Sequence, residues 1–415
     1  MWLGQNSAVW DTSTLNWTNT STALLTNYAL LDSALFDDRG SGQPNVNLAL
    51  VLNPLAVTVN SAANYSFTSS GNNGSLTGSG TLTKADTGTL TVDVTNSLTG
   101  SVLISGGTLQ IGNNDTLGAI GSPVTNNASL VLDRSDATVL PSPIYGTGTV
   151  TMNSGNVTAS SSNSYTGATF INSGITMLAN AAGLGATNGG ISVASGAELY
   201  ITANVDVGDK SLTILGSGVS SAGALRKGGA GVTTYYGLVT LASDTTLSVD
   251  GSATLNLTNS AGLAASSSAN LTLAGSGAGN ITGPLSLGSG NLTVSGGTWT
   301  VAPSNNFSGL TTLNSGGVLR ITGGQSLGPV PGSFNAGEVT FSTGGTLDAA
   351  TNITLNDGNI GITLSASSTI AVDSGATFNI SNQITSSSGV NLTKSSPGTL
   401  VLSGPTTLNL SLIHI

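Results

Sequence analysis

The residues best suited to acid–base chemistry are two adjacent carboxylates, Asp37 and Asp38. Glycoside hydrolysis uses a pair of carboxyl groups that flank one bond, as acid and as base or nucleophile. In a strand, however, neighbouring side chains point to opposite faces, so an adjacent pair does not converge on a single bond. We therefore interpret this pair as a solvated turn before Arg39-Gly40.

Two further pairs of carboxylates could contribute ligands to calcium, which prefers oxygen donors. They are Asp133 with Asp136 and Asp206 with Asp209, each three residues apart in what we interpret as turns. Neither pair belongs to a Gly-Gly-x-Gly-x-Asp repeat or to an EF-hand loop, so we expect ordinary loop carboxylates.

A polysaccharide lyase would need basic residues near bound carboxylates, and the one adjacent basic pair is Arg226-Lys227. Because Gly228-Gly229 follows directly, we interpret this pair as part of a turn.

Three aromatic residues could stack on sugars if they were exposed, namely Tyr235, Tyr236 and Trp299. Trp299 alternates with Thr298 and Thr300, and this favours an inward core position over an outward binding position. We expect no catalytic, cofactor-binding or metal-ligating residues in the chain.

Composition excludes several other chemistries. The 415 residues contain no Cys, which removes disulfides, thiolate nucleophiles and zinc fingers. The single His414 stands one residue from the end, so a His-based triad is not available. Eight basic residues against 18 acidic residues give a formal net charge of −10, which opposes binding to a phosphate backbone. We therefore expect no nucleic-acid partner.

The elements that must position any site are short strands. Segments such as Gly107–Ile111 and Thr254–Thr258 alternate polar and apolar residues, and Gly, Asn or Ser-Gly turns separate them. A sandwich of this length would need a domain boundary, and none is visible. The pattern favours an all-β, right-handed parallel β-helix (a β-solenoid) with coils of roughly 20–25 residues. Asn or Thr stacked at equivalent corners of the coils can form hydrogen-bonded ladders. Trp2, Trp10 and Trp17 predict an N-terminal aromatic cap.

Internal repeats support this architecture. Residues 96–119 align with residues 163–186 over 24 positions without a gap, and a third copy begins at Asn305. A shorter module, Leu-Thr-Lys followed by Gly-Thr-Leu, starts at Leu82 and again at Leu392. We divide the chain into a cap or leader region (1–70), a solenoid repeat region (71–410) and a final segment (411–415) that departs from the pattern and suggests truncation.

The combined pattern resembles the autotransporter-associated β-strand repeat of bacterial surface proteins. It runs Leu-Thr-Lys, Gly-Thr-Leu, Asn-x-aromatic-Thr-Gly, then Leu-Gly, although Leu98 stands where Tyr165 and Phe307 supply the aromatic in the later copies. The resemblance implies a β-helical passenger at the bacterial outer surface or secreted from it. It also implies anchoring through a C-terminal membrane barrel that these residues do not include.

The leading hypothesis is accordingly a non-enzymatic surface passenger, acting as an adhesin or stalk through weak multivalent contacts. The expected partners are glycans, a host or neighbouring cell surface, or a second copy of the chain. The alternatives are a carbohydrate-active β-helix enzyme that uses Asp residues, and a purely structural spacer.

Overall fold

The computed structural model describes residues 1–71, 73–121, 123–141, 143–355 and 358–407. In these residues the chain is all-β, apart from the two short 3-10 turns η1 (Asp38–Gly40) and η2 (Val219–Ser221). No helix among them is long and apolar enough to cross a membrane. The predicted segment 411–415, with His414, lies outside the described residues. The chain divides into two compact units, residues 1–192 and residues 193–415.

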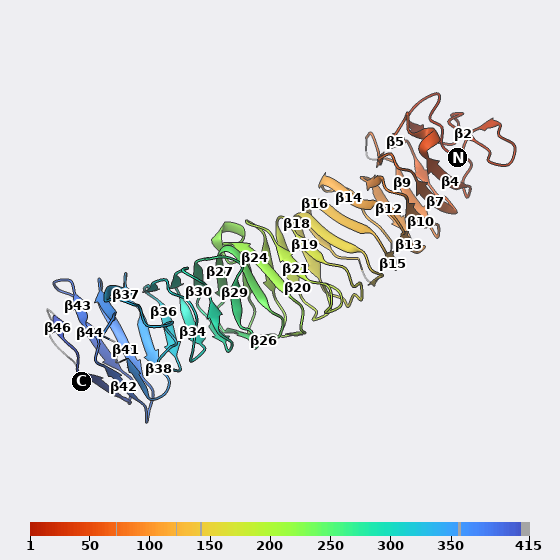
Figure 1. Cartoon of the computed structure of the whole chain (residues 1–415). Helices are drawn as coiled ribbons and strands as arrows, with labels where there is room; N and C mark the ends of the chain where they lie inside the picture. Colours follow the sequence, from red (N-terminus) through yellow and green to blue (C-terminus); the bar gives the residue numbers. More distant parts are fainter. Residues whose placement is uncertain (72, 122, 142, 356–357, 408–415) are drawn as a thin grey trace. The chain divides into compact units, whose positions relative to one another are not determined.

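The first unit is built from parallel strands of successive coils (Figure 1). Its six-stranded sheet contains β4 (Ser33–Asp37), β7 (Ala56–Asn60), β10 (Thr81–Ala85), β13 (Val102–Ile104), β15 (Val124–Asn126) and β17 (Ile144–Tyr145). A second sheet contains β1 (Val9–Trp10), β5 (Asn45–Leu48), β8 (Tyr65–Thr68), β11 (Thr89–Val92), β14 (Thr108–Asp115), β16 (Ser129–Val139), β18 (Thr149–Ala159), β19 (Thr169–Ile171) and β20 (Ile175–Leu178). A three-stranded sheet contains β6 (Val51–Leu52), β9 (Ser75–Gly78) and β12 (Thr95–Leu98), and β2 (Trp17–Thr18) pairs with β3 (Leu25–Thr26) in an antiparallel hairpin.

The second unit repeats this plan. Its nine-stranded sheet contains β23 (Asp206–Val207), β26 (Gly231–Tyr235), β28 (Ala253–Leu257), β31 (Ala278–Ile281), β34 (Gly297–Val301), β36 (Gly317–Ile321), β38 (Thr346–Ala349), β41 (Ser368–Val372) and β44 (Leu392–Ser395). What we call its long sheet contains β22 (Glu198–Ile201), β24 (Leu212–Gly216), β25 (Leu225–Lys227), β27 (Val239–Val249), β29 (Leu263–Ala265), β30 (Leu271–Gly275), β32 (Leu285–Ser286), β33 (Leu292–Val294), β35 (Thr311–Leu313), β37 (Asn335–Phe341), β40 (Ile360–Leu364), β43 (Ile384–Ser386) and β46 (Thr406–Thr407). The strands β39 (Ile353–Leu355), β42 (Thr377–Ile380) and β45 (Thr399–Leu402) form a three-stranded sheet, and β21 (Ile191–Val193) stands at the boundary between the units.

Parallel register between coils confirms the predicted β-solenoid. Leu82, for example, pairs with Val57 of the preceding coil and with Val102 of the following coil. Along strands such as β7, β11 and β28, buried and partly exposed residues alternate, so that Leu, Val and Ile fill the interior. Each coil covers the apolar surface of its neighbours, which is the source of stability in a solenoid.

The predicted aromatic cap is also confirmed. Trp2, Trp10 and Trp17 are buried, and their rings contact each other and Phe36 at centroid distances of 5.2–5.8 Å. Further rings, Tyr28 and Phe67, pack against Trp10. Aromatic pairs at such distances add stability beyond the area that they bury.

Candidate functional site

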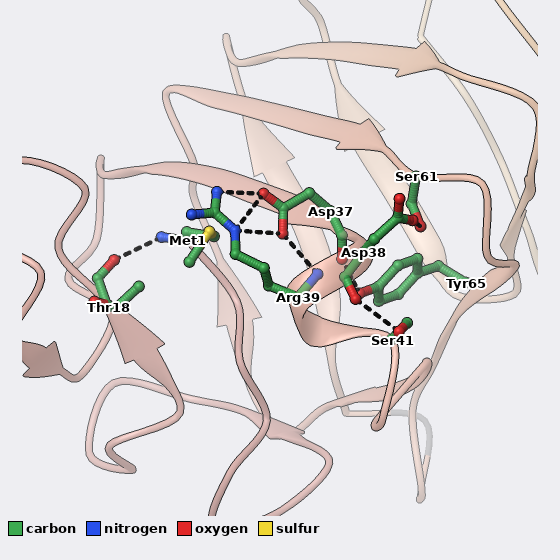
Figure 2. A network of polar contacts seen from close by, with 8 residues as sticks. All are labelled: Met1, Thr18, Asp37, Asp38, Arg39, Ser41, Ser61 and Tyr65. Carbon is green, nitrogen blue, oxygen red and sulfur yellow. Dashed lines mark hydrogen bonds and ion pairs between the residues drawn. The ribbon is translucent and has the colours of Figure 1, made fainter.

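The two adjacent carboxylates Asp37 and Asp38 point apart (Figure 2). Asp37 ends β4 and accepts hydrogen bonds from the Arg39 guanidinium, with Nε 3.0 Å from Oδ2. Asp38 begins the 3-10 turn η1 and accepts from the Ser61 hydroxyl at 2.6 Å and from the Ala62 amide at 2.9 Å. These two hydrogen bonds lower the pKa of Asp38. Both carboxylates therefore hold a turn in place, and they do not face a common bond.

The other carboxylate pairs differ from expectation in their backbone setting. Asp133 and Asp136 lie inside β16 rather than in a turn, at a position where the register with β18 shifts. Asp133 accepts from Ser154, whereas Asp136 is paired with Arg134. The sequence interpretation as a turn was wrong because an irregularity inside a long strand has the same composition as a turn.

Asp206 and Asp209 are both exposed, with Asp206 in β23. Among the described residues, no group of three or more Asp, Glu, His or Cys side chains could hold a metal ion.

The basic pair Arg226-Lys227 lies in strand β25 and not in a turn, which corrects the sequence interpretation. Strand alternation sends the two side chains to opposite faces. Arg226 points outward, forms a bidentate ion pair with Asp250 and stacks on Tyr200 with its guanidinium carbon 4.7 Å from the ring centroid. Lys227 points inward and is fully buried.

Two of the three candidate sugar platforms are buried. Trp299 is fully buried, as its alternation predicted, and its ring packs on Gly279 of the preceding coil. Tyr235 is also fully buried and donates its hydroxyl to the Lys210 carbonyl at 2.8 Å. Tyr236 alone is exposed, at 46%.

Three lysines share a contact pattern that sequence reasoning missed. The amines of Lys84, Lys227 and Lys394 each contact the carbonyl oxygens of the next two residues, at 2.5–3.4 Å. In every case the second of these residues has a positive φ, as Gly229 does at 68°. The Leu-Thr-Lys module therefore encodes a turn closed by a lysine, and Leu225-Arg226-Lys227 is a third copy of it.

The second repeat encodes a different structural contact. Asn163 is buried, accepts from the Ile144 amide at 2.9 Å and donates to the Gly183 carbonyl at 2.7 Å. Asn305 does the same with the Leu285 amide and the Ser326 carbonyl. One amide group thus connects three coils, so these repeated residues serve the fold rather than a ligand.

One surface remains that has an unusual regularity, and we call it the threonine ladder. Seven threonines occupy the same register position on strands of the long sheet that pair one with the next (β27, β30, β33, β35, β37, β40 and β43), and all are partly exposed. They are Thr246, Thr272, Thr293, Thr312, Thr340, Thr363 and Thr385.

Short polar residues accompany the ladder. The residues two positions after the threonines form a flanking row of Ser248, which is buried, the apolar Ala274, and Ser295, Asn314, Ser342, Ser365 and Ser387. In β30, β33, β35, β37, β40 and β43 the one charged residue is Glu338, and it is buried. On these six strands the surface therefore offers hydroxyls and methyl groups without an exposed charge.

A hollow of about 300 Å³ lies at the first rungs of the ladder, lined by Gly216, Ser217, Asp244, Thr245, Thr246, Asn270 and Thr272. Asp244 accepts from both the backbone amide and the side-chain amide of Asn270, at 2.9 Å each. These bonds lower the pKa of Asp244, so a carboxylate adjoins the otherwise uncharged surface.

Fold and surface together define a β-solenoid that carries a row of threonines on an outer face. Among known proteins, a 55-residue stretch is 47% identical to the adhesin BmaC autotransporter of Brucella suis biovar 1 (strain 1330). This stretch covers 13% of the present chain and 2% of that adhesin. No family model matches the chain, and no solved structure matches it. The stretch of similarity and the solenoid both fit the β-helical passenger of an autotransporter.

Proposed function

We propose that this chain is part of a surface-displayed passenger that adheres through many weak contacts, in the manner of an adhesin or an adhesive stalk. The threonine ladder is the observation that carries this proposal. In a row of equivalent hydroxyls, each coil contributes one weak contact. The free energies of such contacts add when several are engaged at once. Similarity to an autotransporter adhesin supports display outside the cell.

The carboxylates that the sequence suggested do not support the carbohydrate-active alternative. A glycosidase needs two carboxyl groups on either side of one bond. The carboxylates of Asp37 and Asp38 instead engage different partners, and Asp136 is paired with Arg134. Release of reducing ends from a neutral polysaccharide by the purified chain would reverse this preference.

Valency provides the test of the proposal. Beads coated with the full chain at several densities would be applied to epithelial cells and to glycan-coated surfaces, with the soluble chain as competitor. We expect the number of adherent beads to rise steeply with the density of chain on each bead. Binding of the soluble chain to the same surface should need a concentration at least about 100-fold higher than binding of the bead-displayed chain. Adhesion that is independent of density, or that a single Asp38→Ala substitution abolishes, would contradict the proposal.

A further inference from the structure

The threonine ladder has the chemistry of a self-complementary surface. A threonine hydroxyl both donates and accepts a hydrogen bond. The hydroxyls of Thr246, Thr272, Thr293 and Thr312 make no hydrogen bond within the described part of the chain. Thr340 donates to the Gly337 carbonyl at 3.1 Å, and Thr363 donates to the Ala336 carbonyl of β37 at 2.7 Å. The hydroxyls of Thr363 and Thr385 lie 3.1 Å apart. Four consecutive rungs are therefore available to an outside partner.

Periodicity restricts which partner can use them all. Successive rungs are separated by the spacing of parallel strands, about 4.8 Å. A partner whose repeat differed by about 0.5 Å would be out of register by about 3 Å after six rungs. A second copy of this chain has the same spacing and the same hydroxyl row, so every rung can meet an equivalent rung.

Charge favours the same partner. The chain carries a formal net charge of −10, so two copies repel each other over most of their surface. In contrast, the strands β30, β33, β35, β37, β40 and β43 carry only the buried Glu338. Two copies that meet through the rungs from Thr272 to Thr385 have no exposed carboxylate on these strands, and the exposed Asp244 lies beside the first rung, Thr246.

The size of the ladder sets the strength of the contact. Six spacings of about 4.8 Å and a width of about three residues give an area on the order of 300 Å² for each copy. The total of about 600 Å² is well below the 1,200 Å² or more of stable interfaces. Such a contact is weak between single molecules and becomes effective only between arrays of molecules.

From these observations we infer that the threonine ladder is a self-association surface, through which copies displayed on facing or neighbouring cells bind one another side to side. This inference rests on the proposed adhesive function and names its partner as a second copy of the chain.

The test compares two triple variants of the full chain. Thr272→Lys, Thr293→Lys and Thr312→Lys place charges on the ladder. The matched control, Thr254→Lys, Thr298→Lys and Thr346→Lys, makes the same change in partly exposed outward positions of the nine-stranded sheet. A third variant, with Val at the three ladder positions, removes the hydroxyls while it keeps the shape and the strand propensity. Circular dichroism checks that all variants fold.

Clumping of coated beads is the readout. We expect beads with the wild-type or control chain to clump, and the two ladder variants to need about tenfold more chain on each bead. The inference is overturned if wild-type beads stay apart, if the control loses clumping as much as the ladder variants, or if the ladder variants clump normally. If the beads stay apart but adhere to cells or glycans, self-association is refuted and the proposed adhesive function is retained. If the beads neither clump nor adhere, both self-association and the proposed adhesive function are refuted.

Discussion

The two units share one solenoid plan but differ in what their outer rows present. In the first unit, one outward row of the second sheet reads Ser66, Thr91, Gln110, Val131, Thr151 and Phe170. The corresponding row of the second unit is threonine at seven consecutive rungs. Most inward residues are apolar in both units, because they fill the interior, whereas outward residues are free to vary. A uniform outer row is therefore not demanded by the fold, and this is why we assign function to it.

The interiors differ as well. The first unit gathers its three Trp rings in one cluster with Tyr28, Phe36 and Phe67, whereas the ring of Trp299 in the second unit packs on the backbone of Gly279. A cluster of rings closes the first coils, while a single ring must be matched by a glycine on the adjacent coil. The following predictions test this difference, from the largest expected effect to the smallest.

Trp10→Ala should destabilise the first unit by about 3–5 kcal/mol, because it opens a cavity among four contacting rings. Hydrogen exchange during denaturant titration measures the loss separately for amides of each unit. Trp299→Ala is the matched variant in the second unit. If Trp10→Ala lowers protection in residues 193–415 as much as in residues 1–192, the two units do not differ in the way described.

Gly279→Ala should cost about 1–3 kcal/mol, because an added Cβ would lie 2.2 Å from ring atoms of Trp299. The control is Gly332→Ala, where no atom lies within 4 Å of the added Cβ. Urea unfolding followed by Trp fluorescence measures both. Equal stability of the two variants would mean that Trp299 does not depend on this glycine.

Lys84→Met and Lys227→Met should each cost about 1–3 kcal/mol, because the carbonyls of the lysine-closed turn lose their donor. Burial lowers the pKa of both lysines below the ordinary 10.5, so the unfolded chain binds more protons at alkaline pH. The stability advantage of the wild type over each variant should therefore increase as the pH rises towards 10.5. Urea midpoints at pH 7 and pH 10 check this, and an advantage that shrinks at pH 10 would contradict it. Similar losses in both units would show that the turn is common to both.

Glu198→Gln should change mainly the pH dependence of the second unit. Glu198 is fully buried, and its burial raises its pKa despite the Arg226 guanidinium 3.6 Å away. A raised pKa gives stability that is present below the ordinary value of 4.5 and is lost as the pH rises through the folded value. The difference in melting temperature between the wild type and the Gln variant should therefore decrease from pH 4 to pH 7. A difference in melting temperature that does not change with pH would mean that the pKa of Glu198 is at its ordinary value.

The sequence was sufficient for the architecture because strand alternation and Gly turns are local signals. The inward orientation of Trp299 and the cap around Trp10 followed from position alone. Arg226-Lys227 was misassigned because Arg226 replaces the usual threonine, which concealed a third copy of the lysine-closed turn.

Individual rungs could not be predicted. The distance along the chain between paired residues varies, from 19 between Thr293 and Thr312 to 28 between Thr312 and Thr340. Because a one-residue change in register moves a side chain to the other face, only the folded structure aligns these threonines. The sequence predicted stacked Asn or Thr at the corners of the coils, whereas the threonines of the ladder lie within strands. Their uninterrupted row on one face required the register of the long sheet.

The central claim is that the partner meets the ladder face of the second unit. The absence of cysteine from the chain allows a single spin label to be placed without background. Ser295→Cys, exposed beside the ladder, and Ser101→Cys, exposed in the first unit, would be labelled in separate samples of bead-displayed chain. The account predicts that adhesion slows the motion of the spin label at position 295 and broadens its spectrum. The spectrum of the label at position 101 should stay unchanged. Broadening at position 101 alone, or equally at both positions, would contradict it.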